Sequence, residues 1–204
     1  LQREKCKHIA GYDVFDRVWE GIEKANAMGF YPIKLNVVAL KGFNDDEFMD
    51  LAKLSFTYPF HIRFIEYMPI GNSRTRCRDQ LLTPEIQEKI SRLGDLIPVE
   101  NHSHDGPARR YRLSGARGEI GFISALSQHF CSRCNRLRLT ADGKLRACLL
   151  SDRHEPLKEM LRGGASDEAL ADIFRIAVRQ KAARHHLALN GSASVNDQMQ
   201  GIGG

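Results

Sequence analysis

The alternation of helical and strand-like segments in the first half of this chain constrains its fold more than any other feature. Apolar residues recur at helical spacing over residues 13–29, and the short β-branched run at 33–40 is typical of a strand. A helix at about 45–56, a second strand at 61–66 and a third helix beginning at Thr83 continue the pattern. Such alternation predicts right-handed crossovers and a parallel sheet or barrel.

The helix ends have recognisable capping signals. Asp13 is the expected N-cap of the first helix, and Gly29 is its expected stop. Asn44 and Glu47, three residues apart, predict a capping box in front of the second helix.

Polar residues interrupt both predicted strands. Lys34 and Asn36 are two residues apart and therefore share a strand face, while Arg63 and Glu66 lie near the end of the next strand. Parallel sheets bind ligands at the carboxyl ends of their strands, so one interpretation is a ligand-facing set. The other interpretation is a salt-bridged set, or one at the edge of the sheet.

The second half contains two predicted hairpins. The first spans residues 109–124 around a glycine-containing turn. The second turns at Asp142-Gly143, a pair that favours two-residue hairpin loops, and this register places Leu137 opposite Cys148 and Leu139 opposite Arg146.

Three of the five cysteines converge in this arrangement. Cys131 and Cys134 precede the second hairpin, and Cys148 returns close to them on its far strand, while Arg136 and Arg138 share one face beside the thiols. Cys6 and Cys77 are isolated and are interpreted as non-ligands.

Converging thiolates indicate either zinc with a fourth ligand or an iron–sulfur cluster with one iron free. His129 and His154 are the candidate fourth ligands for zinc. Spacing alone does not choose between the two metals, and three buried small hydrophobic residues are the structural alternative.

After the hairpins, a short helix is expected near Pro156 and a longer one at about 167–182, with Ser166 as its N-cap. The polar, glycine-rich tail at 190–204 is expected to be frayed.

The positive charge of the chain lies in its second half. Residues 1–95 contain 14 basic and 14 acidic residues, whereas residues 96–204 contain 16 and 11. An anionic ligand or a solvated basic surface would account for this excess. The sequence has no apolar run long enough to span a membrane and no signal-peptide core, so with its odd number of cysteines it is expected to be cytoplasmic and free of disulfides.

With these motifs in place, the chain resembles the GTP 3′,8-cyclases of molybdenum cofactor biosynthesis, a family of radical S-adenosylmethionine enzymes. The resemblance covers essentially the whole chain. The segments that show it are Ile33–Val38, Lys41–Asp46, Arg63–Pro69, Cys131–Thr140 with Cys148, and Gly203-Gly204.

The resemblance implies an α/β fold: the C-terminal part of an incomplete parallel, TIM-like barrel, followed by a C-terminal iron–sulfur domain of β-hairpins and helices. Residues 1–95 would belong to the barrel, and residues 96–204 would bind a 4Fe–4S cluster and GTP. The family makes 3′,8-cyclo-7,8-dihydro-GTP with a 5′-deoxyadenosyl radical, which it generates from S-adenosylmethionine at a second 4Fe–4S cluster. Its product passes to cyclic pyranopterin monophosphate synthase.

Residue roles follow from the same resemblance. Cys131, Cys134 and Cys148 look like the cluster ligands, and Met68 looks like a contact to S-adenosylmethionine. Gly203 and Gly204 resemble the tail that enters the active site. The residues that look like GTP contacts or line its site are Lys34, Arg63, Arg136 and Arg138. No individual side chain is assigned a catalytic role.

One family motif is absent. The C-x-x-x-C-x-x-C sequence that binds the radical-generating cluster does not occur, and neither does the glycine-rich segment for S-adenosylmethionine. The chain therefore looks like the C-terminal portion of a family member, and we expect it to be inactive alone. A homodimer is a further expectation, while nucleic-acid and membrane partners are not expected.

Two other functions are compatible with parts of the sequence. The basic second half and the C-x-x-C pair would suit a zinc-stabilised nucleic-acid-binding module, although aromatic residues are sparse near the arginines. An iron–sulfur electron-transfer protein is the other alternative, but three cysteine ligands leave an iron open that electron transfer does not need.

Overall fold

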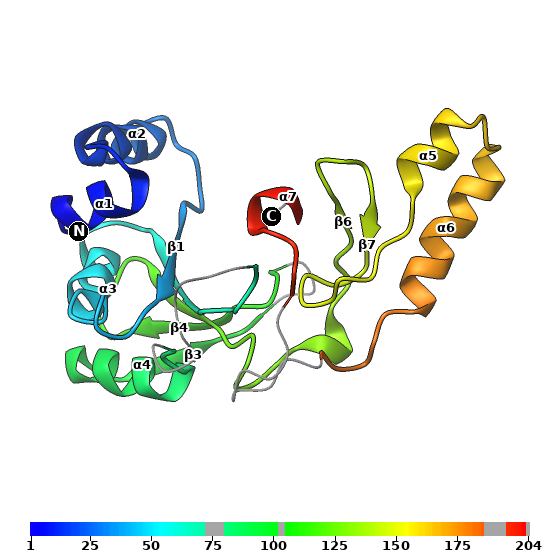
Figure 1. The fold of residues 1–204 in the computed structure, drawn as a ribbon. Coiled ribbons are helices and arrows are strands. Elements are labelled where there is room, and N and C mark those ends of the chain that lie inside the picture. The colour runs from blue at the N-terminus through cyan, green and yellow to red at the C-terminus, as the bar shows by residue number, and fades with distance from the viewer. Residues whose placement is uncertain (72–79, 102–104, 186–194, 203–204) are drawn as a thin grey trace. The chain divides into compact units, whose positions relative to one another are not determined.

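The structure is a computed structural model, shown in Figure 1, and it describes residues 1–71, 80–101, 105–185 and 195–202. The chain divides into two compact units. The first unit consists of Leu1–Tyr67 and Arg78–Ser127, and the second of Met68–Cys77 and Gln128–Gly204. No helix in the described part of the chain is both long and apolar enough to cross a membrane.

A five-stranded mixed sheet forms the centre of the first unit. Its order is β1-β2-β5-β4-β3. The strands are β1 (Lys34–Ala39), β2 (His61–Glu66), β3 (Leu96–Val99), β4 (Arg109–Leu113) and β5 (Glu119–Ile123). β1, β2 and β5 pair in parallel, whereas β4 pairs antiparallel with both of its neighbours, β5 and β3. The predicted α/β class is therefore confirmed, with a mixed sheet that contains three parallel strands.

The hairpin predicted at 109–124 belongs to this sheet, because β5 pairs along the length of β2. Residues 96–127 accordingly belong to the first compact unit, which ends at Ser127. The division at residue 95 remains a prediction about which residues bind the cluster and substrate.

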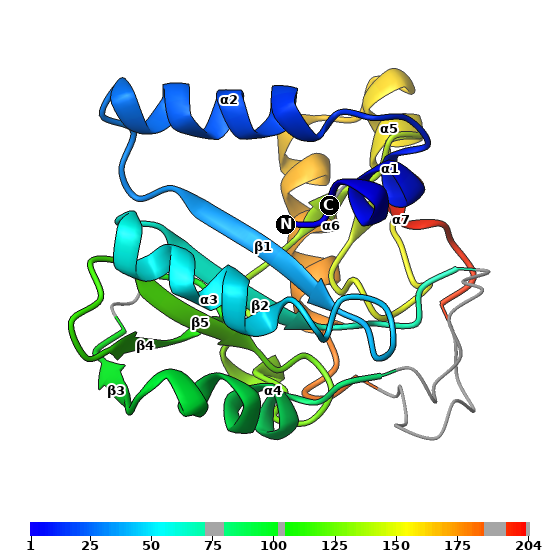
Figure 2. The same ribbon diagram turned by 90° about the vertical axis from the view of Figure 1, so that its left-hand side faces the viewer.

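Two helices cover one face of the sheet, α3 (Phe48–Thr57) and α4 (Thr83–Ile90), as Figure 2 shows. Alternate strand residues point toward them, so Ile62, Phe64 and Phe122 are fully buried. The Phe64 ring lies 5.2 Å from that of Phe48 and 6.1 Å from that of Phe122. These contacts form the main apolar core of the first unit.

Two further helices precede the sheet. α1 (Arg3–Ala10) was not expected, and α2 (Phe15–Ala27) corresponds to the helix predicted at 13–29. Neither helix has a fully buried residue. Asp13 contributes to the start of α2, since its carboxylate accepts a hydrogen bond from the Phe15 amide at 3.4 Å, but it also pairs with Arg3 of α1.

The capping box predicted at Asn44 and Glu47 is wrong. Asn44 instead closes the turn after β1, because its side chain accepts from the Leu40 amide at 2.9 Å and donates to the Val38 carbonyl at 2.9 Å. A turn occupies residues 41–46, and α3 begins only at Phe48. Asparagine side chains favour turns for the same reason that they favour caps, so the sequence signal is ambiguous.

Glu66, the last residue of β2, is completely buried and links three segments. Its carboxylate accepts hydrogen bonds from the Thr83 amide at 2.8 Å, the Leu126 amide at 2.8 Å and the Ser127 amide at 2.9 Å, as well as from the Ser127 hydroxyl. The first residue of α4 and the chain beyond β5 are thereby attached to the end of β2. Glu66 is thus a structural acceptor rather than a ligand-facing residue.

The second unit contains the predicted cysteine hairpin, with β6 (Arg138–Leu139) and β7 (Leu145–Arg146). Its predicted register is wrong by one residue, because Arg138 pairs with Arg146 and Leu139 with Leu145. The loop is longer than two residues. The Gly143 amide donates to the Thr140 carbonyl at 2.9 Å, and the Thr140 amide donates to the Lys144 carbonyl at 2.9 Å.

Gly143 is required at this turn for two reasons. Its φ is +87°, a conformation that favours glycine. A Cβ atom added there would lie 2.5 Å from the Cβ of Lys158, whose amide donates to the Gly143 carbonyl at 2.9 Å. The turn of the hairpin is therefore packed tightly against the start of the next helix.

Helices complete the second unit. They are α5 (Leu157–Arg162), α6 (Asp167–Arg179) and the short α7 (Met199–Ile202). Ser166 is the N-cap of α6, as predicted, and accepts from the Ala169 amide at 3.3 Å. The expectation of a frayed tail is wrong for residues 195–202, because Ile202 is fully buried and the Gly201 carbonyl accepts from the Ala141 amide beside β6 (Figure 1).

Candidate functional site

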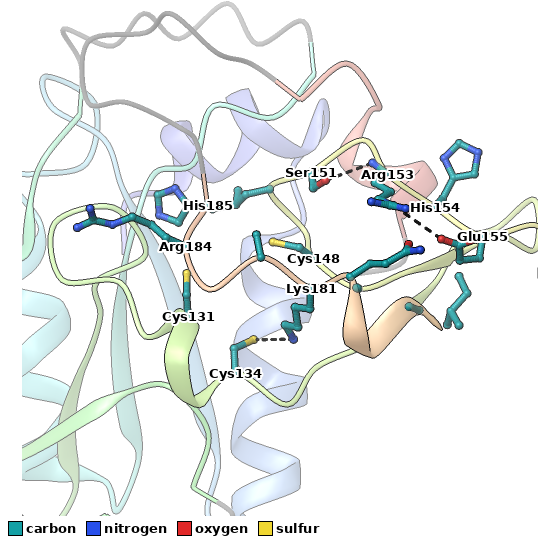
Figure 3. A pocket seen from close by; sticks show the side chains of 16 residues that line it. Cys131, Cys134, Cys148, Ser151, Arg153, His154, Glu155, Lys181, Arg184 and His185 are labelled. Atoms are coloured by element: carbon teal, nitrogen blue, oxygen red, sulfur yellow. Dashed lines mark hydrogen bonds and ion pairs between the residues drawn. The ribbon is translucent and has the colours of Figure 1, made fainter. Parts of the chain in front are cut away.

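Three cysteines line one cavity of the second unit, with a volume of about 240 Å³ (Figure 3). Cys131 opens a 3₁₀ turn, Cys131–Arg133, and Cys134 follows it. Cys148 lies two residues after β7. All three are free thiols and partly buried, so the predicted gathering of Cys131, Cys134 and Cys148 around one space is observed.

The three thiols line this cavity together. Among the described residues, no group of three His, Cys, Asp or Glu side chains is arranged to hold one metal ion. A single zinc ion needs all its sulfur ligands about 2.3 Å from one centre. An iron–sulfur cluster binds each cysteine at a different iron, so it suits thiols spread around a cavity. Three thiols that line one cavity are a donor set that would suit such a cluster.

The two histidines considered as fourth ligands are engaged in other contacts. His129 Nε2 lies 2.7 Å from Arg184 Nε, and His154 Nδ1 lies 3.0 Å from the carbonyl oxygen of Asp152. His154 nevertheless lines the same cavity as the cysteines.

Lys181, which was not among the predicted site residues, contacts one of these cysteines. Lys181 Nζ lies 3.4 Å from Cys134 Sγ and donates to the Arg136 carbonyl at 2.9 Å, as the dashed line to Cys134 in Figure 3 indicates. Burial acts to raise the pKa of the Cys134 thiol, but the Arg136 amide and the Lys181 ammonium outweigh it, and the net pKa is lowered. These surroundings thus make the Cys134 thiol easier to deprotonate than a thiol in water. Lys181 belongs to no sequence motif. It reaches Cys134 only because the chain after α6 folds back toward the cysteines.

The predicted arginine pair lies beside the thiols. The Arg136 guanidinium lies 5.2 Å from the centre of the Phe130 ring, and Arg138 is on β6. Burial lowers the pKa of Arg138, and the neighbouring Arg136 charge lowers it further, while Cys134 and Cys148 act in the opposite direction. These mutual effects place two cations and two sulfurs in one electrostatic environment.

Lys34 and Arg63 belong to a different cavity, in the first unit, with a volume of about 180 Å³. Lys34 is the first residue of β1, and Arg63 on β2 donates from Nε to Asn36 Oδ1 at 2.8 Å. Lys34 pairs in register with His61, the first residue of β2. Lys34 therefore lies at the amino end of its strand, opposite to the carboxyl end at which parallel sheets bind ligands.

A buried ionic network forms one wall of this second cavity. Glu119 accepts from Arg110 Nε at 2.7 Å and from Arg112 Nη2 at 3.0 Å. Burial acts to raise the pKa of Glu119, but the hydrogen bonds from Arg110 and Arg112, together with nearby positive charge, outweigh it and the pKa is lowered. His61 Nε2 lies 3.7 Å from Glu119, yet burial lowers the pKa of His61. No local sequence pattern marks this network. Its residues come together only because β2, β5 and β4 pair in one sheet.

The remaining predicted site residues are Met68, which follows β2, and the glycines at the C-terminal end. Met68 is partly buried and packs against a cluster formed by Ile70, Val195 and Ile202. Gly203 and Gly204 lie outside the described residues. Of the predicted set, the three cysteines line the cavity of the second unit and Arg136 and Arg138 lie near the thiols without lining it, while Lys34 and Arg63 share a cavity in the first unit.

Comparison with known proteins gives concordant matches. The family model for Molybdenum Cofactor Synthesis C matches residues 60–187. A GTP 3′,8-cyclase from Moorella thermoacetica is 48% identical over 92% of this chain and 58% of its own length. One from Heliobacterium modesticaldum is 46% identical over 100% of this chain and 63% of its own length. The molybdenum cofactor biosynthesis protein moc-5 of Caenorhabditis elegans is 38% identical over 99% and 34%.

The chain therefore spans about three fifths of the length of the bacterial relatives that it matches, and about one third of the nematode relative.

Proposed function

Because the chain belongs to the Molybdenum Cofactor Synthesis C family, we propose that it forms the part of a GTP 3′,8-cyclase that anchors a 4Fe–4S cluster and GTP during molybdenum cofactor biosynthesis. The observation that carries the proposal is the cavity of the second unit, which Cys131, Cys134 and Cys148 line together. Arg136 and Arg138 lie in the same electrostatic environment as these thiols.

Cys131, Cys134 and Cys148 are the residues that would hold the cluster. When bound, a cluster with three cysteine ligands supplies one iron with an open position, to which a substrate atom can bind. Lys181 stabilises the thiolate form of Cys134 by charge and hydrogen bonding, which ligation requires.

The basic side chains would compensate the charge of the nucleotide. Three thiolates and a triphosphate are all anionic, so a site that holds both needs several cations nearby. Arg136 and Arg138 meet this need in the second unit. We assign Lys34 and Arg63 to the same substrate on the basis of the family resemblance, together with their shared cavity in the first unit.

The remaining roles belong to the whole protein. Met68 would contact S-adenosylmethionine, and Gly203 and Gly204 would form a tail that reaches the active site. The first unit would be part of an incomplete TIM-like barrel. A second 4Fe–4S cluster would generate the radical, and its motif does not occur in these 204 residues. Cyclic pyranopterin monophosphate synthase would act on the product, and a homodimer remains part of the proposal.

Anaerobic reconstitution of this chain with iron and sulfide, followed by EPR of the reduced sample, tests the proposal. We expect about four irons per chain and a spectrum that GTP perturbs and ATP does not. Cys148→Ser should lower the iron content and change the spectrum, because one ligand is lost. Cys6→Ser is the matched control, since Cys6 is a free, partly buried thiol of α1 in the first unit.

Stoichiometric zinc without iron, together with salt-dependent RNA binding, would instead favour the zinc-stabilised nucleic-acid-binding module. Equal iron content in the Cys148→Ser and Cys6→Ser variants would contradict the ligand assignment.

A further inference from the structure

Among the residues that the structure describes, Arg146 has the largest fully buried side chain, although its guanidinium group is charged. It lies on β7, two residues before Cys148. Its Nη1 lies 2.5 Å from Asp197 Oδ2, and its Nη2 donates to the Ser151 carbonyl and lies 3.7 Å from Asp152 Oδ1. Nε has no hydrogen-bond partner among the described residues, so the buried charge depends on these contacts for compensation.

These partners come from two separate parts of the second unit. Ser151 and Asp152 follow Cys148 by three and four residues, whereas Asp197 lies in the C-terminal segment at 195–202. One guanidinium therefore joins the chain that leaves the cysteine cavity to the segment that ends the described structure. Arginine suits this role because its planar group presents several donors in fixed directions.

The C-terminal segment makes further contacts of the same kind. The Asp152 carboxylate accepts from the Asn196 amide at 3.0 Å and from its side chain at 2.8 Å. The Gly71 amide donates to the Val195 carbonyl at 2.7 Å. Ile202 is fully buried against Ile70 and Val195, so the segment is held at both of its ends.

We propose that Arg146 is a positioning residue that fixes the segment at 195–202 against the loop after Cys148. A link to turnover rests on the proposed function, in which Gly203 and Gly204, the next residues of the chain, would reach the active site. The contact itself does not depend on it. Arg146 touches neither the thiols nor the substrate in this scheme, and acts through Asp197 and Ser151.

Hydrogen exchange of the full 204-residue chain tests the contact. In Arg146→Met, which keeps most of the volume, we expect the amides of 195–202 to exchange about tenfold faster or more, because a charged hydrogen-bond set is lost. Arg146→Lys should restore part of the protection. Arg153→Met is the matched control, because this neighbouring arginine is exposed and its ion-pair contact to Glu155 is 3.8 Å long.

Asp197→Asn provides a milder test should Arg146→Met unfold the second unit, since Asp197 is largely exposed. It should speed exchange in the same segment, and the double variant should add little to it. Unchanged exchange at 195–202 in Asp197→Asn, or an equal increase throughout α6, would overturn the proposal.

The link to turnover requires the intact enzyme. There Arg146→Met should lower kcat with a smaller effect on the KM for GTP, with partial rescue by lysine. Faster exchange with unaltered kinetics would refute the link to turnover. An intact enzyme without cyclase activity would refute the proposed function, while the exchange result would still decide the contact.

Discussion

Single residues determine how the ends of the strands are held in the first unit. Glu66 accepts four hydrogen bonds at the end of β2, from α4 and from the chain after β5. A carboxylate is suited to this position because it is an acceptor at both oxygens.

Glu66→Gln should therefore destabilise the first unit by about 2–3 kcal/mol, because an amide NH₂ group would face backbone N–H donors and leave some unpaired. Chemical denaturation at neutral pH measures the effect. Glu88→Gln on the exposed face of α4 serves as control and should change stability by less than about 0.5 kcal/mol. Equal losses for both variants would contradict the structural role of Glu66.

His61 should give the first unit a pH-dependent stability. Burial lowers its pKa, and the nearby charges of Arg110, Lys34 and Arg63 act in the same direction, against Glu119. The unfolded chain therefore takes up the proton first as the pH falls. Stability is full above the unfolded pKa of about 6.5 and declines below it, by at most about 1.4 kcal/mol per pH unit for one proton.

Denaturation between pH 7.5 and 5 measures this slope. His61→Gln should reduce the slope, whereas the exposed His8→Gln should leave it unchanged. A slope that His61→Gln does not alter would assign the acid sensitivity to other groups.

The cysteines and arginines of the site could be predicted from the sequence, because their spacing around one hairpin is typical of a metal-binding motif. Lys181 was not predictable, since its contact with Cys134 spans 47 positions and depends on how the chain returns after α6. The same is true of Glu119, which meets Arg110 and His61 only once three strands have paired.

At the scale of elements, the hairpin turn makes the clearest prediction. Gly143→Ala should destabilise the second unit by about 3 kcal/mol, because it combines an unfavourable φ with a contact of 2.5 Å to Lys158. Gly164→Ala separates the two effects. That glycine also has a positive φ, +77°, but a Cβ there would meet nothing within 4 Å, so about 1 kcal/mol is expected. Thermal unfolding of both variants gives the comparison, and equal shifts would mean that the packing against α5 is unimportant.

Elements with a strong apolar period were predictable, and those without one were not. β2 matches its predicted residues 61–66, and α6 begins after the predicted cap Ser166. β3 and α7 were missed because they are short, and their order comes from pairing with β4 and from the burial of Ile202. The hairpin register was wrong because a three-residue loop, with Gly143 as its last residue, replaces the two-residue turn that Asp-Gly favours.

At the scale of the whole molecule, the missing motif predicts the behaviour of the isolated chain. Incubated with GTP, S-adenosylmethionine and reductant after reconstitution, it should form no cyclised product, because no C-x-x-x-C-x-x-C sequence is present. Addition of an intact cyclase from Moorella thermoacetica to a parallel reaction is the positive control. Product formation by the chain alone would contradict the prediction.

The α/β class and the family were predictable from the sequence, but the division into compact units was not. Basic and acidic residues are equal in number up to residue 95, and basic residues are in excess after it. Strand pairing instead carries β4 and β5 into the first sheet, and this long-range choice has no local signal in the sequence.

The second unit is built from two stretches of sequence that are made at different times. Ile70 pairs with Val195, which follows it by 125 positions. At a synthesis rate of about 5–20 residues per second, Ile70 exists for about 6–25 s before its partner does. During that interval the nascent chain must keep an apolar segment from pairing elsewhere. A fragment cut to begin after Ser127 would lack this segment and leave Val195 and Ile202 without it.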